Sequence, residues 1–294
     1  MPEHTISDPS GAPVVLVPLD APRTIKGPSA FGGSARRFFA LTWMIAVTDF
    51  KLTYFGSALG YLWSLFRPLM LFGVYFVVFT QIAPLGDDIK NYGGLLLLNI
   101  MLYQFFVEAT SASIMAVTNR ESMVRKMQFP RLVIPLATVT TSLLNLAVNL
   151  VAVLILIALS GVPITWTWLL LPVGVLPLIV LTLSISCILS ALFVRFRDIM
   201  PIWQVFSTAL FYASPILYAI ETPPEHLRQF IQFNPLTPII GQLRHWIIDP
   251  TAPTGWDSVG GWPVGLIPIG ILLLLPPFAI WYFNREAPKV AERL

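Results

Sequence analysis

Long apolar stretches constrain this chain of 294 residues more than any other feature of its sequence. A helix needs about 20 apolar residues to cross the hydrocarbon core of a bilayer, which is about 30 Å thick. Charged residues make up only 11% of the chain, against about 25% in ordinary soluble proteins. The sequence therefore predicts an all-α membrane protein with six transmembrane helices. The six stretches lie at roughly 61–82, 93–117, 132–159, 167–194, 199–220 and 263–283.

The fifth stretch differs from the others because Pro201 and Pro215 flank a run that also contains polar side chains. A transmembrane helix tolerates such residues where neighbouring helices satisfy the backbone groups that proline sets free. We therefore expect a broken helix that is shielded by protein. The third and fourth stretches are longer than a bilayer requires, so we expect them to tilt or to project beyond it.

The residues before the first span form two regions. Residues 1–30 are rich in proline and lack the basic start and continuous apolar run of a signal peptide, so we expect a disordered tail. Residues 31–57 carry apolar residues at helical spacing, which predicts an amphipathic helix lying in the membrane interface. The spans occupy 58–284, and 285–294 form a short second tail.

The distribution of basic residues predicts the orientation. Of the 18 Lys and Arg residues, only Lys90, Arg228 and Arg244 lie on one side of the predicted spans. Basic residues concentrate in cytoplasmic loops, so we predict a multi-pass protein of the plasma (inner) membrane with both termini in the cytoplasm.

Several classes of protein are excluded by what the chain lacks. Cys187 is the single cysteine, and His4, His226 and His245 are far apart in the sequence, which makes a disulfide scaffold or a zinc site unsuitable. The sequence has no G-x-x-x-x-G-K-[ST] loop of the kind that binds nucleotide phosphates. We predict no catalytic residue, no metal and no cofactor in this chain.

The polar connection between the second and third spans, residues 119–135, breaks the apolar pattern. Asn119 or Ser122 is suited to cap a short helix that carries Arg125 and Lys126, and Pro130 ends that helix. One interpretation is a rigid lever held between two spans. The other is a loop that merely satisfies the bias of basic residues toward the cytoplasm.

A set of motifs occurs in order between residues 38 and 284. They are Phe105, Phe106, Val107 and Glu108 followed by Asn119, Lys126, Phe129 and Pro130; Phe196, Arg197, Asp198 and Ile199 followed by Ser214, Pro215, Ile216, Leu217 and Tyr218; Asn234, Pro235, Leu236 and Thr237 followed by Arg244; and Gly60, Tyr61, Leu62 and Trp63 followed by Pro68. Together they resemble the permease subunits of type 2 ABC exporters for cell-surface polysaccharides. The proline-rich tail and Arg67 depart from the family pattern and leave the substrate open.

The resemblance implies a division of labour between subunits. In that family the connection between spans two and three is a coupling helix that docks on a separate ATP-binding subunit, which carries ATP and Mg²⁺. The resemblance further implies a homodimer with two ATP-binding subunits, and the helix before the first span is a second contact with them. It assigns the coupling role to the segment 119–129, through Asn119, Arg120, Ser122, Arg125, Lys126 and Phe129.

The predicted external segment contains two amphipathic stretches between prolines, at 225–233 and 237–248. Both are too short to cross a bilayer. The family has gate helices at this position, so the resemblance implies re-entrant external gate helices within 221–250. A surface loop resting on lipid headgroups is the alternative.

Aromatic residues recur at helical spacing in the first span and join small polar residues in the fifth. Aromatic rings pack against the C–H faces of sugars, and sugar hydroxyls need hydrogen-bond partners. Together with the resemblance, this pattern predicts a glycan pathway, whereas lipid contact or helix packing is the alternative. The proposed pathway residues are Phe72, Tyr75, Phe76, Phe79, Gln204, Ser207, Thr208, Phe211, Tyr212 and Tyr218.

Charged residues within the spans are costly and therefore informative. Arg67 and Glu108 lie at similar predicted depths, so we predict that they form an intramembrane ion pair; a proton relay or a substrate contact at Glu108 is the alternative. A lipid diphosphate headgroup would need cations near the inner entrance. The candidates are Arg36, Arg37, Lys51 and Arg67.

The sequence thus predicts the transmembrane subunit of an ATP-driven exporter of a lipid-linked polysaccharide. Its predicted partners are a second copy of the chain, two ATP-binding subunits, the polysaccharide and membrane lipid, and no nucleic acid. O-antigen, teichoic acid and galactan precursors are all candidate substrates. The alternatives are a drug-exporting relative, a secondary transporter that works without ATP, and a membrane enzyme acting on lipid-linked sugars.

Overall fold

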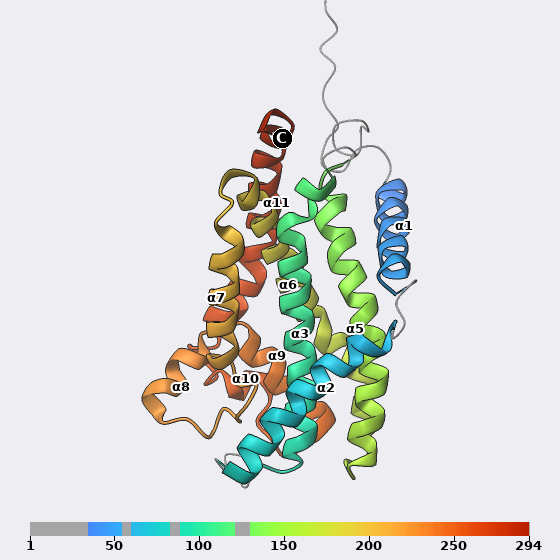
Figure 1. Ribbon diagram of the computed structural model, residues 1–294. Helices are drawn as coiled ribbons and strands as arrows, with labels where there is room; N and C mark the ends of the chain where they lie inside the picture. Colours follow the sequence, from blue (N-terminus) through green and yellow to red (C-terminus); the bar gives the residue numbers. More distant parts are fainter. Residues whose placement is uncertain (1–34, 55–59, 83–88, 121–129, 294) are drawn as a thin grey trace, which may run out of the picture.

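The computed structural model describes residues 35–54, 60–82, 89–120 and 130–293 (Figure 1). Within these ranges all regular secondary structure is helical, which confirms the predicted all-α class. Five helices are long and apolar enough to cross a membrane, and they match five of the predicted spans to within a few residues. They are Leu62–Ile82, Tyr92–Ala116, Val133–Leu159, Trp166–Arg195 and Leu266–Glu286.

Helix α3 (Tyr92–Ala116) is the centre of the bundle, with 72% of its most apolar stretch buried. A helix that is apolar on every side buries every side, and the leucine run at residues 95–98 gives α3 this character. It packs against α5 (Val133–Leu159) and α6 (Leu171–Arg195), which the 3₁₀ turn Trp166–Leu170 precedes. Helix α11 (Leu266–Arg293) packs on α6.

Helix α2 (Leu62–Val77) lies at the edge of the bundle and is extended by the π-helical turn Val78–Ile82. Only 6% of the most apolar stretch of this span is buried, although that stretch is more apolar than the corresponding one in α3. Its main neighbour is α3. The first span therefore exposes most of its apolar surface in a single copy of the chain.

The fifth predicted span is interrupted, as the sequence indicated. Helix α7 (Ile199–Tyr212) has 14 residues. At 1.5 Å per residue it is about 21 Å long, which is short of the bilayer core. Residues 213–220 are irregular but mostly buried, and Pro215 among them has no N–H to donate to a helix. Helix α7 alone is therefore too short to be a sixth membrane-spanning helix beside the five long ones.

Side chains of α3 hold this irregular segment in place. The side-chain amide of Asn99 donates to the carbonyl oxygens of Pro215 and Ile216, at 3.3 Å each. The Tyr92 hydroxyl donates to the carbonyl of Leu217 at 2.8 Å. These carbonyls have lost their helical partners, and buried backbone groups need others. Protein side chains therefore satisfy the backbone groups that the break sets free, as predicted.

The connections fall into two groups at opposite ends of the bundle (Figure 1). The C-terminus, the start of α1 (Ala35–Tyr54) and the end of α3 lie at one end. At the other end lie α8 (Glu225–Gln232), α9 (Leu236–Leu243) and α10 (Gly255–Ser258). This is the division of loops that the sequence predicted. The side that faces the cytoplasm stays a prediction.

Helix α1 accounts for most of the predicted interfacial segment. It packs against α5, and the Thr141 hydroxyl donates to the carbonyl oxygen of Ala46 at 3.2 Å. Its location in the membrane interface stays a prediction, and the proline-rich segment 1–30 lies outside the described residues. At the other terminus the predicted tail is helical, because α11 continues to Arg293.

The segment between α7 and α11 is held together by charged and polar contacts. The π-helical turn Arg244–Ile248 follows α9, and Arg244 Nη1 donates to the Glu221 carboxylate at 2.9 and 3.1 Å. Helix α10 begins with a capping box in which Thr254 and Asp257 bind each other's backbone N–H. Helices α8 and α9 confirm that two short helices form within 221–250, and their role as gates stays a prediction.

Candidate functional site

Two cavities lie beside α2. The polar cavity, of about 290 Å³, is bounded by the last turn of α1 together with α2, α3 and α5. The aromatic groove, of about 190 Å³, is bounded by α2, α3 and α7. Gln104 of α3 lines both, so the two cavities meet beneath α2 at this side chain.

The aromatic groove brings together side chains from two predicted parts of the pathway. Tyr75 of α2 and Tyr212 of α7 face each other with their hydroxyl oxygens 3.4 Å apart. The Tyr75 ring also lies 5.6 Å from the ring of Phe211. Ser207 and Thr208 line the same groove. The combination of rings and hydroxyls that the sequence proposed for a pathway therefore exists in three dimensions.

The other proposed pathway residues do not line this groove. Phe72 and Phe79 pack, partly buried, against the hydrophobic core, and Phe76 is exposed elsewhere on α2. Gln204 is exposed on α7. The Tyr218 hydroxyl donates to the carbonyl oxygen of Tyr212 at 3.0 Å and so closes the end of that helix.

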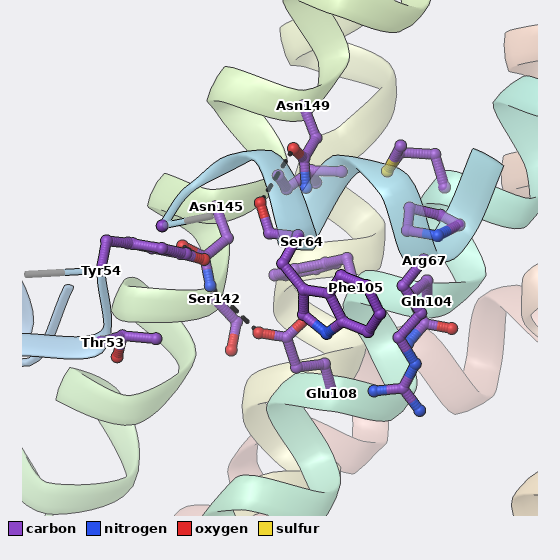
Figure 2. Close-up of a pocket in the computed structure, with 15 residues that line it drawn as sticks. Thr53, Tyr54, Ser64, Arg67, Gln104, Phe105, Glu108, Ser142, Asn145 and Asn149 are labelled. Carbon is purple, nitrogen blue, oxygen red and sulfur yellow. Dashed lines mark hydrogen bonds between the residues drawn. The ribbon is translucent and has the colours of Figure 1, made fainter. Parts of the chain in front are cut away.

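The polar cavity is built around Asn145 of α5 (Figure 2). The Tyr54 hydroxyl donates to Asn145 Oδ1 at 2.8 Å, and Asn145 Nδ2 donates to Glu108 Oε1 at 3.0 Å. One turn further along α5, Asn149 Oδ1 accepts a hydrogen bond from the Tyr61 hydroxyl. The wall of the cavity is therefore held by hydrogen bonds between α1, α2, α3 and α5.

The prediction of a direct Arg67–Glu108 ion pair needs correction. Both side chains line the polar cavity, and the charge of Arg67 acts on Glu108 electrostatically. The ion pairs within 4.0 Å among the described residues nevertheless do not include these two. The carboxylate of Glu108 is bound by Asn145 instead. The two charged residues, predicted to lie at matching depths, line one cavity. The hydrogen-bond partner of Glu108, however, is Asn145 of a third helix, α5.

The candidate headgroup cations are not gathered in one place. Arg36 and Arg37 are exposed in the first turn of α1, whereas Lys51 is exposed near its end. Arg36 and Lys51 are about 22 Å apart along the helix at 1.5 Å per residue. Arg67 lines the polar cavity. The four residues therefore do not form a single anion site.

The coupling segment is described only at its start. Asn119 and Arg120 belong to a 3₁₀ turn, Thr118–Arg120, that follows α3. Arg120 forms an ion pair with Asp49 of α1. Ser122, Arg125, Lys126 and Phe129 lie outside the described residues.

Four residues that hold the wall of the polar cavity were not among the predicted site residues. Asn145 and Asn149 are four positions apart in an apolar span, and this i, i+4 spacing places both on one helix face. Two amides on one face of a membrane helix are a signal that the sequence offered. The roles of Tyr54 and Tyr61 depended on how α1 meets α2, which no local pattern indicates. No described cluster of His, Cys, Asp or Glu is placed to hold a metal ion.

Comparisons with known proteins agree with the architecture. Residues 40–247 match the family described as ABC-2 type transporter. Two relatives from Klebsiella pneumoniae, both named O-antigen export system permease protein RfbA, are 28% and 30% identical over 87% of this chain and 95% of each relative. A protein of the same name from Myxococcus xanthus is 29% identical over 81% of this chain and 90% of the relative. Both cavities lie within the matched segment.

Proposed function

Because this chain belongs to the ABC-2 type transporter family, we propose that it is the transmembrane subunit of an ATP-driven exporter that moves a lipid-linked polysaccharide outward across the plasma membrane. The names of its relatives as O-antigen export permeases support this class of substrate. The subunit is a permease and not itself an enzyme, and the family pairs it with an ATP-binding partner. O-antigen, teichoic acid and galactan precursors remain the candidate cargoes.

The observation that carries this proposal is the aromatic groove between α2, α3 and α7. Tyr75, Phe211 and Tyr212 offer ring faces there, while Ser207 and Thr208 offer hydroxyls. A polymer of sugars presents C–H faces and hydroxyls at every unit. Such contacts are weak and repetitive, so a chain slides along them instead of binding at one register.

The proposed transport path uses six crossings and an external gate. Helix α7 and the irregular segment 213–220 together form the fifth crossing, and protein shields the break. Both termini lie in the cytoplasm. Helices α8 and α9 narrow the outer mouth, and the exposed Leu227 and Phe230 of α8 give it an apolar face toward lipid.

The proposed assembly is a homodimer with the pathway between the two copies. Apolar side chains stand exposed on α2 and α7, on both sides of the aromatic groove, among them Met70, Val74, Val205 and Phe206. A second copy placed against this face would cover them and enclose the groove.

The proposed coupling route starts at residues 119–129. This segment docks on the ATP-binding subunit, and the ion pair of Arg120 with Asp49 carries its movement to α1. Helix α1 precedes α2 in the sequence, and α2 forms one wall of both cavities. Arg36, Arg37 and Lys51, all exposed on α1, are proposed to guide the anionic headgroup along that helix, whereas Arg67 lies in the polar cavity beside Glu108.

Reconstitution with the ATP-binding subunit tests the proposal. We expect a lipid-linked glycan to stimulate ATP hydrolysis by the complex in lipid vesicles, and Phe211→Ala to reduce that stimulation several-fold. Val173→Ala, an exposed change on α6 outside both cavities, is the matched control and should have no effect.

Two results would contradict the proposal. Stimulation by a small hydrophobic drug, with none by any glycan, would favour the drug-exporting branch of the family. Transport by this chain in vesicles without an ATP-binding subunit would favour a secondary transporter.

A further inference from the structure

We infer that the polar cavity binds a single sugar ring of the exported molecule, and that it does so separately from the aromatic groove. This inference rests on the proposed function, because it assumes a glycan substrate. The cavity lies between α1, α2, α3 and α5, whereas the groove lies further along α2, between α2, α3 and α7.

Three polar side chains in the cavity have hydrogen-bonding capacity to spare. Arg67 and Gln104 make no hydrogen bond to another described residue, and neither does Oε2 of Glu108. A guanidinium has five N–H donors, and an amide offers both donors and an acceptor. Arg67 and Glu108 are exposed and Gln104 is half-buried, so a ligand can reach all three. Charged groups within membrane spans are rare and usually mark a function.

The charge of the cavity favours hydroxyls over phosphate. Arg67 and Glu108 both line it, so their opposite charges balance within one small space. A diphosphate would gain from Arg67 but would be repelled by the Glu108 carboxylate. Vicinal hydroxyls of a sugar act as donors and acceptors together, so one ring can donate to Glu108 and accept from Arg67 and Gln104.

An aromatic face completes the site. Trp63 of α2 lines the cavity, and 55% of its surface is exposed. A tryptophan ring gives a flat apolar surface against which the C–H face of a sugar packs. The volume of about 290 Å³ is at the lower end of small-molecule sites, which run from about 300 to 1,000 Å³, and suits one ring better than a chain.

The polar wall opposite Arg67 is fixed before any ligand arrives. Figure 2 shows Tyr54, Asn145 and Glu108 on one side of the cavity and Arg67 with Gln104 on the other. The bonds from Tyr54 to Asn145 and from Asn145 to Glu108 hold the carboxylate in one orientation. A binding group that is held in place loses less conformational entropy when the ligand binds. Gln104, shared with the aromatic groove, marks where the ring would pass from one cavity to the other.

The test compares carriers with and without sugar on the complete complex. The reconstituted permease and ATP-binding subunit are titrated with polyprenyl diphosphate and with the same lipid carrying one sugar, and stimulation of ATP hydrolysis gives a half-saturating concentration for each. We expect Glu108→Gln and Trp63→Leu each to raise the value for the sugar-bearing lipid about tenfold, which corresponds to about 1.4 kcal/mol. The value for the bare lipid should stay within twofold. Trp166→Leu removes an exposed tryptophan far from the cavity and should change neither.

The outcomes separate this inference from the proposed function. One outcome is that both carriers stimulate the wild-type complex while Glu108→Gln raises the half-saturating concentration equally for both. In that case the cavity binds the diphosphate or supports the fold, and the sugar site is overturned. If the variants match the wild type with both carriers, the cavity binds neither and the inference fails while the exporter stands. If no carrier stimulates the wild-type complex, the proposed function fails, and this inference, which rests on it, fails as well.

Discussion

Asp49 of α1 and Arg120, in the turn that follows α3, form an ion pair across two segments that are 71 residues apart in the sequence. Their side chains are 31% and 21% exposed. The pair joins the helix that precedes the first span to the start of the proposed coupling segment. A displacement of that segment would therefore move α1 with it.

Breaking this ion pair should uncouple ATP hydrolysis from transport more than it unfolds the protein. Asp49→Asn leaves the Arg120 charge without its partner, and we expect a loss of about 1 kcal/mol in stability because the pair is partly exposed. Transport per ATP hydrolysed should fall several-fold in reconstituted vesicles. The exchanged double variant, Asp49→Arg with Arg120→Asp, should recover much of it. A double variant as poor as Arg120→Asp alone would refute the mechanical role.

Removing the amide of Asn99 should destabilise the irregular segment 213–220. Asn99→Leu keeps the branched shape of the side chain but leaves the carbonyls of Pro215 and Ile216 without their donor. Hydrogen bonds between membrane helices contribute about 0.6 kcal/mol on average and up to about 1.7 kcal/mol. Since one amide serves two buried carbonyls, we expect a loss of about 1–2 kcal/mol, measured as denaturation in detergent. Tyr92→Phe, the matched control, removes only one hydrogen bond to the same segment, from the Tyr92 hydroxyl to the carbonyl of Leu217, and should cost less. Equal losses would show that the second carbonyl bound by Asn99 adds nothing.

Two glycines should respond to alanine in opposite directions. A Cβ at Gly255 would lie against the carbonyl oxygen of Pro238, which is backbone and cannot rotate away. We expect Gly255→Ala to cost about 1–3 kcal/mol through overpacking between α9 and α10. Gly270, in α11, has open space where its Cβ would be. Gly270→Ala should therefore stabilise the protein by about 0.5–1 kcal/mol, because alanine favours a helix. Thermal unfolding of the two variants gives the comparison.

Acid should loosen the start of α10. Hydrogen bonds from the hydroxyl and then the backbone N–H of Thr254 hold the pKa of Asp257 below its ordinary value. A carboxyl whose pKa is lowered by folding stabilises the fold above its unfolded pKa, about 3.9, and that contribution is lost as the pH falls through the folded pKa. Amide protection at residues 255–260, corrected for intrinsic exchange rates, should stay constant from pH 7 to about pH 5 and decline below about pH 4.

The variant Asp257→Asn provides the control for this acid response. Its amide oxygen still accepts the two hydrogen bonds, but the side chain does not titrate. Protection in the variant should therefore be independent of pH over the same window. A decline in the variant that matches the wild type would assign the acid response to another group.

The sequence predicted where the helices lie along the chain better than it predicted which helices contact each other. Span length and apolar composition were sufficient for the five long helices, because both are local properties. The end of α7 at Tyr212 depended on Pro215 and on donors from α3, and only the first of these is visible locally. Helical spacing in α2 identified one aromatic row, but only Tyr75 of that row reaches the groove. Which face of a helix meets which neighbour is set by packing across the bundle.

The charged residues illustrate the same limit. Depth along a span follows from counting residues, and this placed Arg67 and Glu108 at one cavity. The rotation of α5 about its own axis does not follow from counting, and it is this rotation that inserts Asn145 beside Glu108. Two polar residues four positions apart in an apolar helix identify a polar face of that helix. Only the structure shows which residues that face contacts.

The reliance of residues 213–220 on α3 has a consequence for how the polypeptide is made. The ribosome releases α3 well before α7, so Asn99 and Tyr92 are already lodged in the bilayer when the carbonyls that they bind leave the translocon. A circular permutant that synthesised α7 first would send those carbonyls into lipid with no donor waiting. The order of the helices along the gene is thus itself part of what lets residues 213–220 insert.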